Sequence, residues 1–135
     1  MDNTELAYAA GFFDGEGCFG IKMHAGKRGP FHTPYATISQ IRPEILIWLR
    51  GHFGGSIRFN PSSGRNGIWA LQLSARKSLD LMKALRPFLR IKRAEVDLIL
   101  EAFASPTVNR RGGVLKEVQE LRQANREKVM AIRRG

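Results

Sequence analysis

The stretch of sequence that decides the fold runs from residue 6 to residue 19 and reads LAYAAGFFDGEGCF. Within it, the small residues Ala7, Gly11 and Gly15 recur at every fourth position. Positions four apart lie on one face of a helix, so the pattern predicts a helix over residues 4–15 with a stripe of small side chains along it.

The small-residue stripe requires a packing partner. Glycine inside a helix costs roughly 0.5–1 kcal/mol relative to alanine, so Gly11 needs a reason to be there. A stripe of this kind allows another helix backbone to approach closely. The partner is either another element of the same chain or the same helix of a second subunit, because a two-fold interface joins identical patches. For the second case we expect a homodimer interface at Ala7, Ala10, Gly11 and Gly15.

Two carboxylates follow at the C-terminal end of this helix. The helix dipole makes that end negative, so Asp14 and Glu16 are disfavoured there unless something offsets their charge. A divalent cation would do so, since carboxylates and free backbone carbonyls are the oxygen ligands that Mg²⁺ prefers. Two helices packed through their small faces would bring both acidic ends together. The other interpretation is a pair of solvated surface acids.

The rest of the chain alternates strand and helix patterns. Asn3 or Thr4 is the expected N-cap of the first helix. Strands are expected at 18–24, 35–40, 56–60 and 68–74, and further helices at about 43–54, 79–87, 94–104 and 113–132, with turns or linkers at 61–67, 105–106 and 109–113. The order αββαββα predicts an α+β fold, in which a four-stranded antiparallel, saddle-like sheet is covered by helices on one face. We expect a single domain with its core over about residues 4–105 and a basic C-terminal helical extension.

Charge favours a polyanionic partner. The chain of 135 residues carries +10, and residues 1–17 hold four acids but no Lys or Arg, which leaves +14 on the remainder. Nucleic acid is the usual partner of such a chain, although a ribosomal, membrane-surface or merely solvated basic protein has the same property. The single cysteine, Cys18, excludes an internal disulfide and a cysteine-based zinc cluster, which agrees with a reducing, intracellular setting. No apolar stretch is long enough to span a bilayer.

The outward face of the predicted sheet is polar and partly basic. It consists of Lys22, His24, Tyr35, Thr37, Ser56, Arg58, Asn60 and Gln72. Such a face is either solvated or used to read nucleic acid, and the charge of the chain favours the second function. His32 is a further candidate for a DNA contact.

The run AAGFFDGEG at residues 9–17 resembles the LAGLIDADG motif of homing endonucleases, and the resemblance covers roughly residues 5–105. One copy is present, and single-motif members of that family are homodimers. The resemblance implies an endonuclease that cuts both strands of a long, pseudo-palindromic double-stranded DNA site by metal-dependent phosphodiester hydrolysis. It also implies an intracellular location such as a bacterial cytoplasm, a phage-infected cell or an organelle.

The resemblance also assigns catalytic roles. Glu16 stands where the family has its metal ligand, often Asp, and Gly15 where a backbone carbonyl reaches the Mg²⁺ or Mn²⁺. Gln40, in TISQ, is similar to a residue near the reacting water. Lys92, in LRPFLRIKRAE, is similar to a lysine near the scissile phosphate, although Arg90 or Arg93 could serve instead. Asp14 is expected to be structural.

The DNA contacts are expected to divide into two kinds. Lys22, His24, Tyr35, Thr37, Arg58, Asn60 and Gln72 would read bases in the major groove, while Lys27, Arg28 and the basic tail would bind phosphates. The main alternative is a LAGLIDADG protein that binds DNA or RNA without cutting, such as an intron maturase or a transcriptional regulator. A basic ribosome-associated protein would leave the AAGFFDGEG run unexplained.

Overall fold

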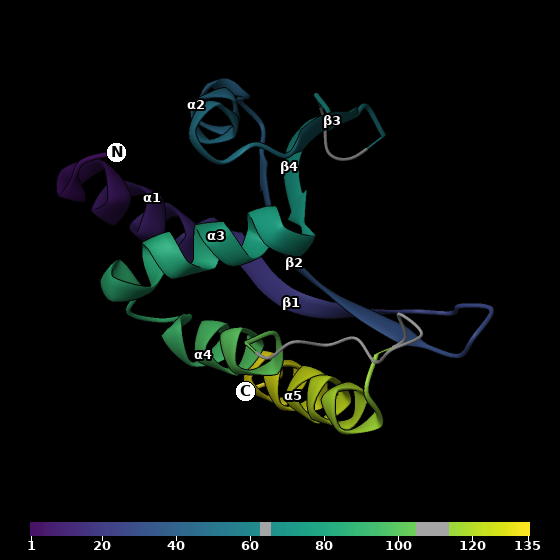
Figure 1. Ribbon diagram of the computed structural model, residues 1–135. Helices are drawn as coiled ribbons and strands as arrows, with labels where there is room; N and C mark the ends of the chain where they lie inside the picture. The colour runs from purple at the N-terminus through teal and green to yellow at the C-terminus, as the bar shows by residue number, and fades with distance from the viewer. Residues whose placement is uncertain (63–65, 105–113) are drawn as a thin grey trace.

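The computed structural model describes residues 1–62, 66–104 and 114–135, and it confirms the predicted α+β fold (Figure 1). In chain order the elements are α1 (Asn3–Glu16), β1 (Gly17–His24), β2 (Phe31–Gln40), α2 (Glu44–Phe53), β3 (Ser56–Asn60), β4 (Ile68–Ser74), α3 (Ala75–Leu85), the 3₁₀ turn η1 (Arg86–Phe88), α4 (Arg93–Ala102) and α5 (Lys116–Arg133). None of the described helices is long and apolar enough to cross a membrane.

The four strands form one antiparallel sheet in the order β1-β2-β4-β3. The register pairs Gly17 with Ile38 at the start of β1, and Gln72 of β4 with both Thr37 and Ser56. Directly opposed residues share a face, so this register fixes which side chains lie together on each side of the sheet. β2 begins earlier than the predicted residue 35 because its pairing with β1 continues to the pair of His24 and Phe31.

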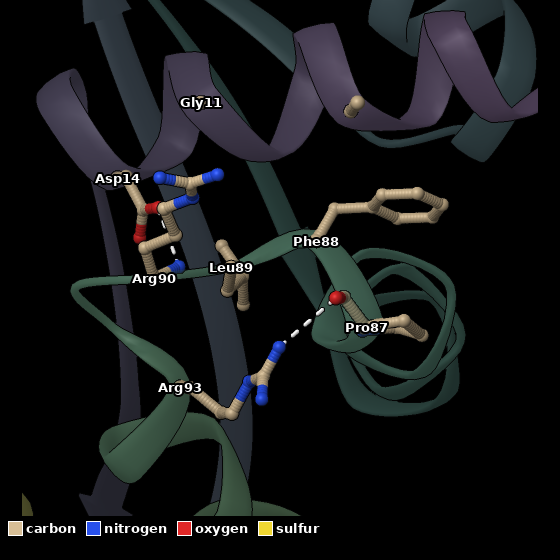
Figure 2. Close-up of a pocket in the computed structure, with 8 residues that line it drawn as sticks. Gly11, Asp14, Pro87, Phe88, Leu89, Arg90 and Arg93 are labelled. Atoms are coloured by element: carbon tan, nitrogen blue, oxygen red, sulfur yellow. Dashed lines mark hydrogen bonds between the residues drawn. The ribbon is translucent and has the colours of Figure 1, made fainter.

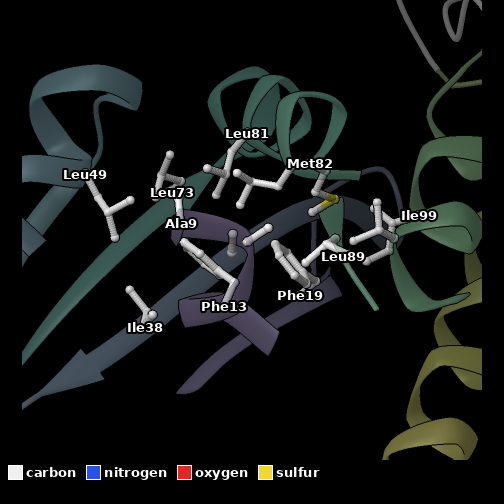
Figure 3. Close-up of a cluster of buried hydrophobic side chains, with 14 of the residues drawn as sticks. Ala9, Phe13, Phe19, Ile38, Leu49, Leu73, Leu81, Met82, Leu89 and Ile99 are labelled. Atoms are coloured by element: carbon white, nitrogen blue, oxygen red, sulfur yellow. The ribbon is translucent and has the colours of Figure 1, made fainter. Parts of the chain in front are cut away.

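The apolar face of the sheet and the helices enclose a single core (Figure 3). Strand side chains that are at most 5% exposed contribute from that face, namely Phe19, Ile21, Ala36, Ile38, Leu71 and Leu73. Phe13 of α1, Met82 of α3, Ile99 of α4 and Val129 of α5 close the core from the helix side. Trp48 and Trp69 pack against it while partly buried.

Both ends of α1 are determined locally. Asp2, rather than the predicted Asn3 or Thr4, is the N-cap. Its carboxylate accepts from the Glu5 backbone N–H at 2.8 Å, and the Glu5 carboxylate accepts from the Asp2 backbone N–H at 3.4 Å. At the other end Gly17 turns directly into β1. A Cβ on Gly17 would lie 2.4 Å from the Phe13 ring, so only glycine lets the strand begin this close to the helix.

The C-terminal helix α5 packs against α4 and β1 (Figure 1). Asn125 is fully buried and donates through Nδ2 to the Leu98 carbonyl at 2.8 Å. Arg122 is also buried, with its guanidinium 4.1 Å from the centre of the Phe103 ring, and burial lowers the pKa of this arginine. The predicted linkers at 105–106 and 109–113, and positions 63–65 of the predicted turn, lie outside the described residues.

Asp14 joins the end of α1 to the loop before α4. Its carboxylate accepts from the backbone N–H groups of Arg90 at 2.8 Å, Ile91 at 3.2 Å and Lys92 at 3.0 Å. The Lys92 ammonium then donates to the carbonyls of Phe13 at 2.9 Å and Gly17 at 2.5 Å. This places a positive charge against the negative end of the helix, where it is favourable.

Replacing Asp14 tests the connection between α1 and the loop before α4. Asp14→Ala removes the shared acceptor of three backbone N–H groups, and we expect a loss of about 2 kcal/mol in the free energy of unfolding, measured by urea denaturation. Asp14→Asn keeps one oxygen and should lose roughly half as much. Glu16→Ala is the matched control and should change stability by less than about 0.5 kcal/mol. Equal effects of Asp14→Ala and Glu16→Ala would refute a special role for Asp14.

Candidate nucleic-acid interface and active site

The two acids at the end of α1 have different surroundings. The Asp14 carboxylate is occupied by backbone N–H groups and lines a cleft (Figure 2). Glu16 is exposed, and within the described residues its side chain makes no hydrogen bond or ion pair. Of the two, Glu16 is therefore the carboxylate that is free to meet a cation.

Three of the predicted catalytic residues belong to separate segments that meet near the end of α1. Lys92 reaches the C-terminal end of α1 through its bonds to Phe13 and Gly17. β2 continues two residues past Ile38, the partner of Gly17, so Gln40 lies at the end of the sheet where α1 joins β1. Glu16 and Gly15 form the last residues of that helix. The register thus places the end of β2 near the end of α1, whose carbonyls accept from the Lys92 ammonium.

The two alternative cations of the same segment differ in position, since Arg90 lies beside Asp14 of α1 and Arg93 points to η1 (Figure 2). Arg93 donates to the Pro87 carbonyl at 2.9 Å, away from the end of α1. Arg90 and Arg93 line a cleft of about 530 Å³ between η1 and the small-residue stripe of α1 (Figure 2). Among residues 90–93, Lys92 is the one whose side chain donates hydrogen bonds to the Phe13 and Gly17 carbonyls.

The donor set at the helix end suits a hard cation but is incomplete. Within residues 1–62, 66–104 and 114–135, no three His, Cys, Asp or Glu side chains come together as a metal site. One chain offers the Glu16 carboxylate and the Gly15 carbonyl, which belongs to the last helical turn, where carbonyls run out of N–H partners from the helix. These are oxygen ligands of the type that Mg²⁺ accepts, and further ligands would have to come from outside the chain.

The small-residue stripe is open to solvent. A Cβ added at Gly11 or at Gly15 would meet nothing within 4 Å, and Ala7 is exposed. Packing within the described chain therefore does not explain these glycines. Ala10 does not share this surface, contrary to the prediction. It is 0% exposed and part of the core, because its position is rotated about 100° from Gly11 toward the sheet.

The register places the predicted polar residues on one face of the sheet. Gln72 lies opposite Thr37 on one side and Ser56 on the other, and Tyr35, Lys22 and Arg58 have the same parity. The imidazole of His24 is less free than its neighbours, since it stacks on Phe31 at 4.7 Å. We name this surface the polar face, consisting of Lys22, His24, Tyr35, Thr37, Ser56, Arg58, Asn60 and Gln72.

The other residues predicted to contact DNA lie outside the polar face. Lys27 and Arg28 are exposed in the loop between β1 and β2. His32 is 7% exposed on the opposite face of the sheet, where its Nε2 contacts the Gln123 Oε1 at 2.8 Å, so it is not available for the DNA contact considered for it. Its even position in β2, shared with the buried Ala36 and Ile38, was the available signal.

The sequence did not identify two arginines of α5 beside the polar face. Arg126 lines a recess of about 390 Å³ together with Lys22, Tyr35, Thr37 and Gln72. Arg133 donates to the Tyr35 hydroxyl at 3.3 Å. The only signal in the sequence was that the tail is basic.

The architecture is similar to that of solved homing endonucleases. I-CvuI in complex with DNA matches 98% of this chain and 83% of its own, with a TM-score of 0.81 and 21% identity. The archaeal intron-encoded I-Vdi141I, also complexed with DNA, matches 98% of this chain and 96% of its own, with a TM-score of 0.70 and 17% identity. The LAGLIDADG enzyme I-GzeII matches 95% of this chain but 43% of its own, with a TM-score of 0.63 and 21% identity.

No protein-family model and no curated protein matches the sequence. The chain nevertheless has the fold of the LAGLIDADG homing endonucleases, and its first helix ends in a run of residues that resembles their motif.

Proposed function

We propose that this protein is a site-specific homing endonuclease that makes double-strand breaks in a long, pseudo-palindromic DNA site as a homodimer. The observation that carries the proposal is that the charged residues at the end of α1 make different contacts. Asp14 is bound to the 90–92 loop, the Lys92 ammonium binds the Phe13 and Gly17 carbonyls, and Glu16 makes no hydrogen bond or ion pair with the described residues. The DNA complexes of I-CvuI and I-Vdi141I support the choice of double-stranded DNA as the substrate.

The open stripe of α1 supports the homodimer. Ala7, Gly11 and Gly15 present a surface with no side chain to hinder a second helix. A two-fold pairing of this stripe would bring the Glu16 residues of two chains to one place. That pairing would supply the ligands that one chain lacks.

Glu16 and the Gly15 carbonyl would hold Mg²⁺ or Mn²⁺, a choice supported by the I-CvuI structures with magnesium and with calcium. Such an ion would polarise the scissile phosphate and make water more acidic. Two donors of the Lys92 ammonium contact carbonyls, so its third can reach a phosphate oxygen and stabilise developing negative charge. The Gln40 amide would orient the attacking water.

The polar face would read bases in the major groove, whose edges carry a distinct donor and acceptor pattern for each base pair. Lys27 and Arg28 would bind phosphates from their exposed loop. Phosphate contacts position the protein without carrying sequence information, whereas base contacts specify the site.

Glu16→Gln should abolish cleavage while DNA binding survives. The amide keeps the size of the side chain but removes the charge that a divalent ion requires, so we expect the cleavage rate with Mg²⁺ to fall by at least about 100-fold. Glu117→Gln, an exposed acid in the first turn of α5, is the matched control. Binding and cleavage are measured in parallel on the cognate site.

Near wild-type cutting by Glu16→Gln would disprove the catalytic role of Glu16. A wild-type protein that binds its site tightly but never cuts would favour a LAGLIDADG binding protein instead. Preferential binding to RNA would favour a maturase.

Gly11→Leu should separate the two helices of the dimer. A leucine side chain projects into the space that a second helix would occupy, so both dimerisation and cleavage should decrease by at least about tenfold. Gly51→Leu is the control, because Gly51 lies in α2 and a Cβ there also meets nothing within 4 Å. Sedimentation velocity gives the oligomeric state. An active wild-type monomer at micromolar concentration would contradict the proposal.

Arg58→Ala and Lys27→Ala should have different effects on binding. Loss of a base contact costs about 1–3 kcal/mol of discrimination, so Arg58→Ala should relax preference at one or two base pairs of each half-site. Lys27→Ala should weaken binding to all sequences and reduce its salt dependence. Selection from a randomised DNA library, repeated at two salt concentrations, measures both. A uniform weakening by Arg58→Ala would argue against base reading at that position.

A further inference from the structure

Arg133, from the last turn of α5, bridges the edge of the sheet and the polar face. β1 is an edge strand, so backbone groups on its outer side have no strand partner. The Arg133 Nη2 donates to one of them, the Phe19 carbonyl, and its Nη1 donates to the Tyr35 hydroxyl at 3.3 Å. The same guanidinium carbon lies 6.0 Å from the centre of the Tyr35 ring.

Gly20 makes this bridge possible. It lies directly opposite Tyr35 in the β1–β2 register. A Cβ at Gly20 would come within 2.4 Å of the Arg133 Nη2 and 2.5 Å of the Tyr35 hydroxyl oxygen. The tyrosine side chain and the guanidinium therefore occupy the space that any other residue at position 20 would fill.

The helix that carries Arg133 is itself firmly anchored. The buried Asn125 binds the Leu98 carbonyl of α4, and Val129, one turn before Arg133, is 1% exposed in the core. Arg126 of the same helix lines the recess next to Tyr35 and Lys22. The position of Arg133 relative to the sheet is thus set by packing rather than by the arginine alone.

We propose that Arg133 is a positioning residue for sequence recognition, which holds Tyr35 in its base-reading orientation and so makes specificity depend on the C-terminal helix. The inference rests on the proposed function, in that the polar face reads DNA. Arg133 donates to the hydroxyl oxygen, which leaves the hydroxyl hydrogen for an acceptor on a base edge, such as a purine N7. The Cys18 Sγ, 3.9 Å from the same oxygen, is only a weak competitor.

The test compares base preference at each position of the half-site for the full-length protein and its variants. We expect Arg133→Ala and Tyr35→Phe each to reduce preference at the same base pair by about tenfold. The double variant should lose no more than either single variant, because both remove one interaction. Arg133→Lys, which keeps one donor and the charge, should recover part of the preference.

Arg134→Ala is the matched control, since it removes the same charge from the neighbouring exposed residue. It should weaken binding to all sequences equally. If Arg133→Ala has that same uniform effect, or if it relaxes preference at a base pair that Tyr35→Phe leaves unchanged, the proposal is overturned.

A measurement without DNA separates this inference from the proposed function. The chain has two tyrosines, so tyrosine-labelled protein gives two sets of NMR ring signals. Arg133→Ala should shift those of Tyr35 and leave those of Tyr8 in place, while Arg134→Ala should shift neither. Unchanged Tyr35 signals would overturn the contact. A wild-type protein without any base preference would instead contradict the proposal that the polar face reads DNA. The positioning role of Arg133 would then fail as well, even if the NMR signals confirm its contact with Tyr35.

Discussion

The arrangement of the site depends on one carboxylate that accepts three backbone hydrogen bonds. Asp14 lies at the C-terminal end of a helix, where its charge is unfavourable, and the N–H groups of residues 90–92 offset that cost. Because the loop is held there, the Lys92 ammonium reaches the carbonyls of Phe13 and Gly17. The ammonium thereby adds a second hydrogen bond to the Phe13 carbonyl, which already accepts from the Gly17 N–H, and also binds the Gly17 carbonyl. Glu16 then remains at this end without a hydrogen bond or ion pair to any residue that the structure describes.

The features that the sequence predicted well are those with a local period. Alternation placed the polar face correctly, because side chains along a strand point to the two faces in strict turn. The registers of the three strand pairs bring the outward residues of all four strands to the same face. The stripe of Ala7, Gly11 and Gly15 was predicted in the same way from the helical period. The ends of elements were less accurate, because the N-cap at Asp2 and the start of β2 depend on particular hydrogen bonds.

The features that the sequence did not predict are non-local. The carboxylate of Asp14 finds its partners 76 to 78 residues later, and Arg133 meets Phe19 across a separation of 114. Neither pairing leaves a pattern along the chain. Ala10 was assigned to the exposed stripe because its small size fitted, but one residue of helix turns it from the open face into the core. His32 likewise lies on the buried side of a strand whose other side is polar.

The guanidinium at the edge of β1 has a consequence for how copies of this protein can associate. An exposed strand edge is a template on which further chains can add, and such growth has no natural end. Here the Phe19 carbonyl is already bonded to Arg133. The opposite edge, β3, is only five residues long and carries the exposed Arg58. Short, charged or covered edges disfavour fibre growth, so neither edge of this sheet is a good template for the addition of further strands.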